Sequence, residues 1–336
     1  MKIFILHSDV QELERMDEQG TLEQVNEITQ LLQSMGMICC ARPFTHTENA
    51  IAELLTYQPD KVFNLVESVD GRSEHNYLVP LLLESFGIPY TGGDARSLLC
   101  TDNKLLAKQL LIHKNLPTPT WRENSTFDLE DNSPFSSPYI IKPVTEDGSY
   151  CISVDAIVTC SSELSNLVAT FPVHYKTRWI AEEYIEGREF YIPIISNKGR
   201  FFILPISEFV FFDECIPPIA DYTVKWDKTS PRFYQSERRY DFPAQDSALL
   251  NQLRNLGAEC CKEFPLSGYA RIDVRVDRNN NPWILEINTN PDLSKDSGFI
   301  FAGKQIGLEY SDMISMIIND DWDIRYLQKI QSYGIK

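Results

Sequence analysis

Two segments near the C-terminus, each rich in β-branched residues, carry the side chains best suited to chemistry, and an Asn-rich turn at residues 278–281 separates them. This pattern predicts a β-hairpin. Asp273 on the first segment and Glu286 and Asn288 on the second would then meet on one face of the paired strands. Two carboxylates and an amide, with no His or Cys nearby, form a hard oxygen-ligand set that suits Mg2+.

Arg271 stands two residues before Asp273 and therefore points to the same face of its strand. An arginine beside a metal site suits an anionic substrate such as a phosphate or a carboxylate. The alternative is a sheet with a solvated acidic face. We favour the metal site because Glu286 and Asn288 lie within an apolar strand, where an unpaired carboxylate is costly to bury.

A second candidate site could grip a phosphate. Lys142 lies near the end of a predicted strand at residues 139–143, and a small polar loop at residues 146–150, which includes Ser149, follows it. Lysines supply point charges, and a Gly/Ser loop supplies backbone N–H groups to phosphate oxygens. A solvated surface lysine is the alternative interpretation.

Lys104 belongs to a predicted helix that we expect Asp102 to cap. Lys108 lies one turn after Lys104 and on the same helix face. Lysines on this helix could add point charges to the same phosphate grip.

The elements that must position these residues differ between the two ends of the chain. Residues 1–96 alternate apolar strands, at residues 2–7 and 61–66, with helices at residues 22–35 and 77–86. Such alternation predicts a parallel sheet with helices on both faces.

The C-terminal half is predicted to contain antiparallel strands. Residues 190–212 read as consecutive strands with a hairpin turn at residues 197–199, and an irregular stretch containing Lys225 follows. The amphipathic pattern at residues 246–264 predicts a helix packed behind the metal hairpin, and residues 310–319 form a final apolar helix.

Composition excludes several classes of partner. The net charge of −17 argues against sequence-independent binding of nucleic acid or of an anionic membrane. The chain has 8 cysteines but no Cys-x-x-Cys, and its adjacent pairs at residues 39–40 and 260–261 are predicted to be small buried hydrophobes in a reducing compartment. The sequence begins with a strand and shows no long apolar run, so we expect a cytoplasmic protein.

Residues 298–305 have the glycine and lysine spacing of a Walker A loop. The segment lacks the closing Ser or Thr, does not follow a predicted strand, and carries the bulky run Phe-Ile-Phe. We interpret it as the packed start of a helix.

The segment ARIDVRVD…PWILEINTNPDLS resembles the metal-binding end of the ATP-grasp ligases and, within that superfamily, the D-alanine–D-alanine ligases. VFNLVES…GIPYTGG is similar to their N-terminal substrate domain. The resemblance implies an α/β (α+β) ATP-grasp fold. It divides into a Rossmann-like N-terminal substrate domain at residues 1–96, a central ATP-grasp subdomain at 97–188 and a C-terminal catalytic subdomain at 189–336.

The resemblance also implies ATP and a pair of Mg2+ ions, with Mn2+ as an alternative, and assigns roles by position. Asp273, Glu286 and Asn288 would hold the metal, and Arg271 would stabilise an oxyanion. Lys104 and Lys142 would contact the phosphates, and Ser149 would lie in the family's mobile loop. Glu182 would accept from the adenine amino group, Glu183 and Ile185 would line the base, and Glu189 would bind the ribose hydroxyls. Lys225 would reach the terminal phosphate. Trp226 replaces the usual Tyr after that last lysine.

The substrate half departs from the family. The Ser/Glu motif that anchors the first amino acid is absent, Glu67 and its neighbours replace a His-Gly segment, and Asp292 replaces a Gly of the oxyanion site. Ser297 keeps a position that holds the second substrate's carboxylate in the family.

We therefore predict an ATP-dependent carboxylate–amine ligase that forms an amide through an acyl phosphate. Its substrates would be amino acids other than D-alanine or a peptide, because the amino-acid anchor is missing. The alternatives are a true D-alanine–D-alanine ligase of cell-wall synthesis and a non-catalytic ATP-binding homologue. A homodimer is left open.

Overall fold

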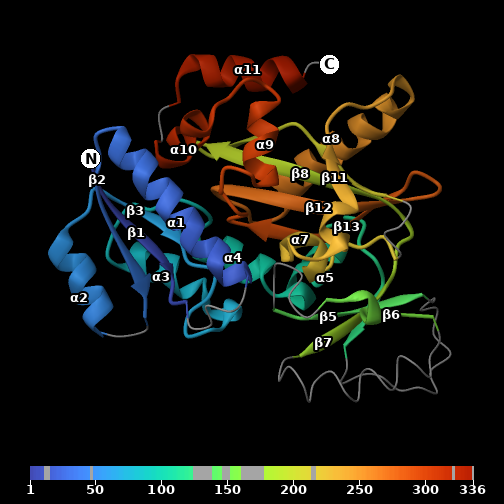
Figure 1. Ribbon diagram of the computed structural model, residues 1–336, viewed down its shortest axis with the longest axis horizontal. Coiled ribbons are helices and arrows are strands. Elements are labelled where there is room, and N and C mark those ends of the chain that lie inside the picture. The colour runs from blue at the N-terminus through green and yellow to red at the C-terminus, as the bar shows by residue number, and fades with distance from the viewer. Residues whose placement is uncertain are drawn as a thin grey trace.

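The structure is a computed structural model that describes residues 1–10, 16–45, 48–123, 138–145, 152–159, 178–212, 217–319 and 322–334. These residues form three β-sheets with helices around them (Figure 1). A blue N-terminal sheet lies at one end of the molecule, and a small green sheet lies beside a larger orange and yellow sheet at the other. The predicted mixed α/β fold class is confirmed.

The N-terminal sheet is parallel, in the order β2-β1-β3. Its strands and its helices are β1 (Lys2–Ser8), β2 (Ile38–Phe44), β3 (Lys61–Leu65), α1 (Met16–Ser34), α2 (Glu48–Tyr57) and α3 (Leu78–Ser85). Side chains alternate along β1, so Ile3 packs in one cluster with Ile28 of α1, and Phe4 packs in another with Leu54 of α2. The predicted parallel sheet with helices on both faces is confirmed.

The small sheet is antiparallel, in the order β4-β7-β5-β6. Its strands are β4 (Trp121–Glu123), β5 (Tyr139–Pro143), β6 (Ile157–Val158) and β7 (Trp179–Glu183), and the helices α4 (Ala95–Thr101) and α5 (Lys104–His113) precede it in the chain. The predicted capping residue of α5 was wrong. Asn103 has the extended backbone of an N-cap and accepts from the Leu106 N–H, whereas Asp102 has helical angles and ends α4.

The largest sheet is antiparallel, in the order β11-β10-β8-β12-β13, with β9 also paired to β8. Its strands are β8 (Gly187–Asn197), β9 (Arg200–Ile203), β10 (Ser207–Phe211), β11 (Ser236–Arg239), β12 (Tyr269–Asp277) and β13 (Pro282–Thr289). Helix α8 (Ser247–Glu263) covers one face, where Leu253 packs in one cluster with Ile272 and Ile284 of the hairpin. The predicted helix behind the metal hairpin is confirmed.

Both predicted hairpins are present. Strands β12 and β13 pair antiparallel, and β8 and β9 pair through a turn at Lys198 and Gly199, both with positive φ. Gly187, at φ +154, is required where β8 begins, because a Cβ there would lie 1.9 Å from the Val276 carbonyl oxygen.

Two predictions about the last third of the chain were incomplete. The stretch predicted to be irregular contains a short helix, α7 (Tyr222–Trp226), because Asp221 accepts from the Val224 N–H and caps it. The apolar helix α10 (Tyr310–Ile318) is not the last, since α11 (Ile324–Gly334) follows it. Residues 298–304 form helix α9 (Gly298–Lys304), whose Phe299 and Ile300 are buried, as the interpretation of that segment as a packed helix start required.

The cysteines are less buried than predicted. Cys39 and Cys40 are half-buried because β2 is an edge strand, and Cys261 is half-buried on α8, whereas Cys260 is buried. None of the helices in the described ranges is both long and apolar enough to cross a membrane. Within the described ranges, 3-10 turns also lie at Ser73–His75, Val154–Ala156, Pro231–Tyr234 and Ala244–Asp246.

Candidate active site

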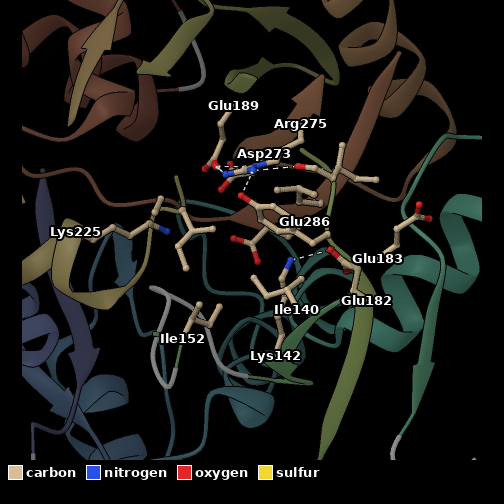
Figure 2. Close-up of a pocket in the computed structure, with 15 residues that line it drawn as sticks. Ile140, Lys142, Ile152, Glu182, Glu183, Glu189, Lys225, Asp273, Arg275 and Glu286 are labelled. Carbon is tan, nitrogen blue, oxygen red and sulfur yellow. Dashed lines mark hydrogen bonds and ion pairs between the residues drawn. The ribbon is translucent and has the colours of Figure 1, made fainter. Parts of the chain in front are cut away.

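A pocket lies between the small sheet and the large sheet, and side chains from both point into it (Figure 2). It gathers many of the residues that the sequence singled out, namely Lys142, Glu182, Glu183, Ile185, Glu189, Lys225, Asp273 and Glu286. These come from β5, β7, β8, α7, β12, β13 and, for Ile185, the connection between β7 and β8, so the site exists only once the two sheets have packed together.

The hairpin presents its acids through a β-bulge. Asp273 pairs with Glu286, but Val274 pairs with Ile284, so Leu285 is the extra residue on β13. The bulge shifts the side-chain alternation of β13, and both Leu285 and Glu286 line the pocket.

Arg271 and Asn288 complete the cluster. Arg271 donates to both oxygens of buried Asp273, from Nε to Oδ1 at 2.6 Å and from Nη2 to Oδ2 at 2.7 Å. The Asn288 amide lies 3.2 Å from Asp273 Oδ2 and 3.4 Å from Glu286 Oε1. The predicted meeting of these side chains on one face is therefore observed.

The pKa values of the two acids are shifted in opposite directions. Burial raises the pKa of Asp273 to about 6, although Arg271 opposes the shift. Burial also opposes ionisation of Glu286, but four cations, at Lys104, Lys225, Lys142 and Arg271, outweigh it and lower its pKa to about 2. Lys104 Nζ lies 3.8 Å from Glu286 Oε2. The donor set, two carboxylates and an amide without sulfur or imidazole, fits Mg2+.

Glu182 lies in a buried ion triad. Its Oε1 is 2.9 Å from Lys142 Nζ, and its Oε2 is 2.7 Å from Lys108 Nζ. Burial opposes ionisation of Glu182, but the two lysines outweigh it and lower its pKa. Lys108 lies one turn after Lys104 in the sequence, but nothing local in the sequence indicates that α5 faces β7 or that Lys108 reaches Glu182.

Glu189 is paired with Arg275, which the sequence analysis did not single out. Arg275 is 3% exposed and donates to Glu189 Oε2 from Nη2 at 3.0 Å. Its Nη1 donates to the Tyr184 hydroxyl and to the Ile185 carbonyl oxygen, both at 3.0 Å. Tyr191 donates to the other oxygen of Glu189 at 2.9 Å. The available signal was strand alternation, which places residues 271, 273 and 275 on one face.

Helix α7 carries Lys225 into the same pocket. Burial lowers the pKa of Lys225, and Glu286 opposes the shift. The ring of Trp226, the next residue, approaches Gly20 of α1, where an added Cβ would lie 3.2 Å from it. Lys225 therefore sits on an element that also contacts the N-terminal part of the chain.

The predicted substrate residues lie outside the lining of this pocket. Ser297 is buried and caps α9, and the Asp292 carboxylate accepts from the Ser294 N–H at 2.8 Å and from its hydroxyl at 2.6 Å. Glu67 is exposed after β3. Burial raises the pKa of Tyr269, and Glu67 and Asp292 add to the shift, so the two acids face the same tyrosine. Ser149 lies outside the described residues.

Comparison with known proteins gives a consistent match. The family model described as D-ala D-ala ligase C-terminus matches residues 113–319. The chain is 30% identical to uncharacterized protein y4sG of Sinorhizobium fredii, covering 77% of this chain and 73% of that protein. It is 29% identical to a D-alanine–D-alanine ligase of Aquifex aeolicus, covering 79% and 84%.

A solved structure shows the same fold. The D-alanine–D-alanine ligase from Bacillus anthracis complexed with ATP superposes with a TM-score of 0.71 at 21% identity. The match covers 99% of this chain and 100% of that one. The described elements therefore form an ATP-grasp fold along essentially the whole chain.

Proposed function

Because the chain belongs to the D-alanine–D-alanine ligase family of ATP-dependent ligases, we propose that it joins a carboxylate to an amine through an acyl phosphate. The observation that carries the proposal is the charge pattern around Glu286. Lys104, Lys142, Lys225 and Arg271 converge on the Glu286 carboxylate, and two of them, Lys142 and Arg271, also pair with Glu182 and Asp273. Such a cluster suits a polyphosphate.

The reaction would proceed in two steps. A substrate carboxylate oxygen attacks the terminal phosphorus of ATP, and ADP leaves with the electrons of the broken P–O bond. The amine then attacks the acyl carbon, loses a proton, and expels inorganic phosphate as the amide forms. Lys104, Lys142 and Lys225 would neutralise phosphate charge in the first step, and Arg271 would stabilise the tetrahedral oxyanion in the second.

The hairpin acids provide the metal ligands in this proposal. Asp273, Glu286 and Asn288 would hold Mg2+, or Mn2+ as an alternative, and the bound ion supplies positive charge beside the phosphates. In the structure Arg271 occupies both oxygens of Asp273, so it serves as that acid's counter-ion.

The nucleotide would lie in the pocket between the sheets. Glu182 would accept from the adenine amino group, the backbone at Glu183 and the side chain of Ile185 would line the base, and Glu189 would bind the ribose hydroxyls. Support comes from the position of all four in the lining of a single pocket, and from the ATP complex of a structurally similar ligase. Ser149, in the segment before β6, is proposed to act over the phosphates.

The acyl substrates are proposed to be an amino acid or a peptide other than D-alanine. Glu67 and Asp292 both act on Tyr269 and make this region acidic, which favours an amine-bearing first substrate. Because Ser294 holds the Asp292 carboxylate, the acid turns into its own loop. Ser297 is proposed to hold the second substrate's carboxylate. A true D-alanine–D-alanine ligase is the second candidate, since a curated relative bears that name.

The proposal extends to organisation and setting. We place the substrate domain at residues 1–96 and the two ATP-grasp subdomains at 97–188 and 189–336. We also propose a cytoplasmic location, which the five free thiols of the described residues support, and we leave a homodimer open.

The experiment is an assay of ADP release with ATP, Mg2+ and pools of amino acids, short peptides and acidic metabolites, followed by mass measurement of the product. A product whose mass equals the two substrates minus one water supports a ligase. ATP binding without ADP release in any pool would favour the non-catalytic alternative.

A further inference from the structure

Lys108 is a buried cation that the proposed reaction does not use. Its side chain is 1% exposed, its Nζ lies 2.7 Å from Glu182 Oε2, and it donates to the Thr118 hydroxyl at 2.9 Å. Thr118 in turn donates to the Ile284 carbonyl oxygen on β13 at 2.9 Å. Lys108 does not line the pocket, so it holds Glu182 from behind.

Lys142 contacts the same carboxylate from the opposite side. Its Nζ lies 2.9 Å from Glu182 Oε1, and its side chain lines the pocket (Figure 2). Glu182 is thus a single buried carboxylate between two lysines, one enclosed by protein and one facing the site. The triad carries one net positive charge.

The two lysines are held differently. Lys108 contacts Glu182 and Thr118, and its Nζ lies 5.7 Å from the Trp121 ring centroid. These contacts come from two parts of the fold, β7 and the segment that leads into β4. Within the described residues, the Lys142 ammonium group pairs with Glu182. Lys142 can therefore leave Glu182 by a side-chain movement, whereas Lys108 cannot.

Nucleotide binding creates a conflict that this arrangement resolves. In the proposed function, Lys142 contacts a phosphate while Glu182 contacts the base, so the Lys142–Glu182 pair must separate. A buried carboxylate that loses its counter-ion is strongly destabilised. With Lys108 in place, Glu182 keeps one counter-ion throughout the exchange.

We propose that Lys108 is a positioning residue for the nucleotide: it stays on Glu182 as a fixed counter-ion and so frees Lys142 to pair with phosphate. The inference rests on the proposed function only in requiring that ATP occupies this pocket. It does not depend on the acyl substrates or on turnover.

The test is calorimetric binding of Mg-ATP to the full chain without an acceptor substrate. In Lys108→Met the Lys142–Glu182 pair remains and balances the buried charge, so the protein should fold, but ATP must now break the last ion pair of Glu182. We expect the dissociation constant to rise about tenfold or more. In steady-state assays of the same variant, the KM for ATP should rise more than kcat falls. Lys114→Met, the same substitution at the exposed end of α5, is the control and should bind as the wild type does.

A substitution of the carboxylate itself, Glu182→Gln, separates this role of Lys108 from a general structural role. In Glu182→Gln no charge is left to compensate, so adding Lys108→Met should change ATP affinity far less than it does in the wild-type background. Lys108→Gln removes the charge but keeps a hydrogen-bonding group near Thr118, and it replaces the Met variant if that one does not fold.

Three results would overturn the inference. They are wild-type affinity in a folded Lys108 variant, an equal loss of affinity in the Glu182→Gln background, and a loss confined to kcat. A wild-type protein that binds ATP but forms no amide would remove the proposed ligase activity and leave the role of Lys108 standing.

Discussion

Arg271 and Asp273 form a two-point ion pair, with Nε–Oδ1 and Nη2–Oδ2 distances of 2.6 and 2.7 Å, on one face of β12. The proposed function gives these residues different tasks, an oxyanion donor and a metal ligand. If the proposed metal binds at Asp273, its binding and the orientation of Arg271 would be coupled through this pair.

Replacing a proposed metal ligand should sharply reduce turnover without unfolding the protein. Glu286→Gln is nearly isosteric but removes the anion that four cations stabilise. We expect ADP release to fall by about a hundredfold or more, with partial recovery at high Mg2+. Steady-state assays across Mg2+ concentrations measure this, and wild-type-like activity at low Mg2+ would remove Glu286 from the metal site.

The proposed adenine contact at Glu182 should make the protein favour ATP over GTP. The Glu182 carboxylate can accept from the adenine amino group but repels the guanine carbonyl oxygen. We expect kcat/KM for ATP to exceed that for GTP by about a hundredfold or more. Glu182→Gln should narrow the ratio, because an amide can also donate. Equal use of the two nucleotides by the wild type would contradict the assignment of this edge.

Arg275 should stabilise the fold through Glu189. Arg275→Met leaves a buried carboxylate without its cation, so the free energy of unfolding should fall by about 3 kcal/mol. Arg278 lies on the same hairpin as Arg275, and Arg278→Met breaks its exposed ion pair with Glu186. This change should alter the free energy of unfolding by less than about 1 kcal/mol. Urea denaturation of both variants gives the comparison, and equal effects would show that Arg275 does not act through burial.

Asp246 should contribute stability in a pH-dependent way. Arg188 donates to both of its oxygens, at 3.0 and 2.7 Å, and lowers the pKa of Asp246. The stabilisation is fully present above the ordinary Asp pKa, near 4, and is lost as pH falls through the lowered value. Asp246→Asn should therefore cost about 1 kcal/mol at pH 7 and progressively less toward pH 2.

The check is urea denaturation at several pH values, with Asp241→Asn as the exposed control. A difference between wild type and Asp246→Asn that stays constant down to pH 2 would show that the pair with Arg188 is not the cause.

D-alanine should be a poor first substrate. The sequence lacks the Ser/Glu motif that anchors the first amino acid in the resembling family. A site that leaves a substrate's ammonium group without a carboxylate partner rejects that substrate by orders of magnitude. We expect faster ADP release with another amino acid or a peptide in side-by-side assays at saturating ATP and Mg2+. A kcat of about 1 per second or more with D-alanine alone would instead identify a plain D-alanine–D-alanine ligase.

Local pattern in the sequence was enough for the hairpin, the parallel N-terminal sheet and the cluster of Arg271, Asp273, Glu286 and Asn288. Strand alternation and turn composition are properties of neighbouring residues, so they can be read without knowing the fold. The same holds for the family resemblance, which depends on short segments around these residues.

Tertiary packing decided the ion pairs between residues that are far apart in the sequence. Lys108 meets Glu182 across 74 positions of sequence, and Arg275 meets Glu189 across 86, because α5 packs on β7 and β12 pairs with β8. The bulge at Leu285 and the cap at Asn103 likewise depend on the register of a partner strand and on where a preceding helix ends. Burial and long-range contacts determine these pairings and the pKa shifts that follow from them. Neither can be read from the linear sequence.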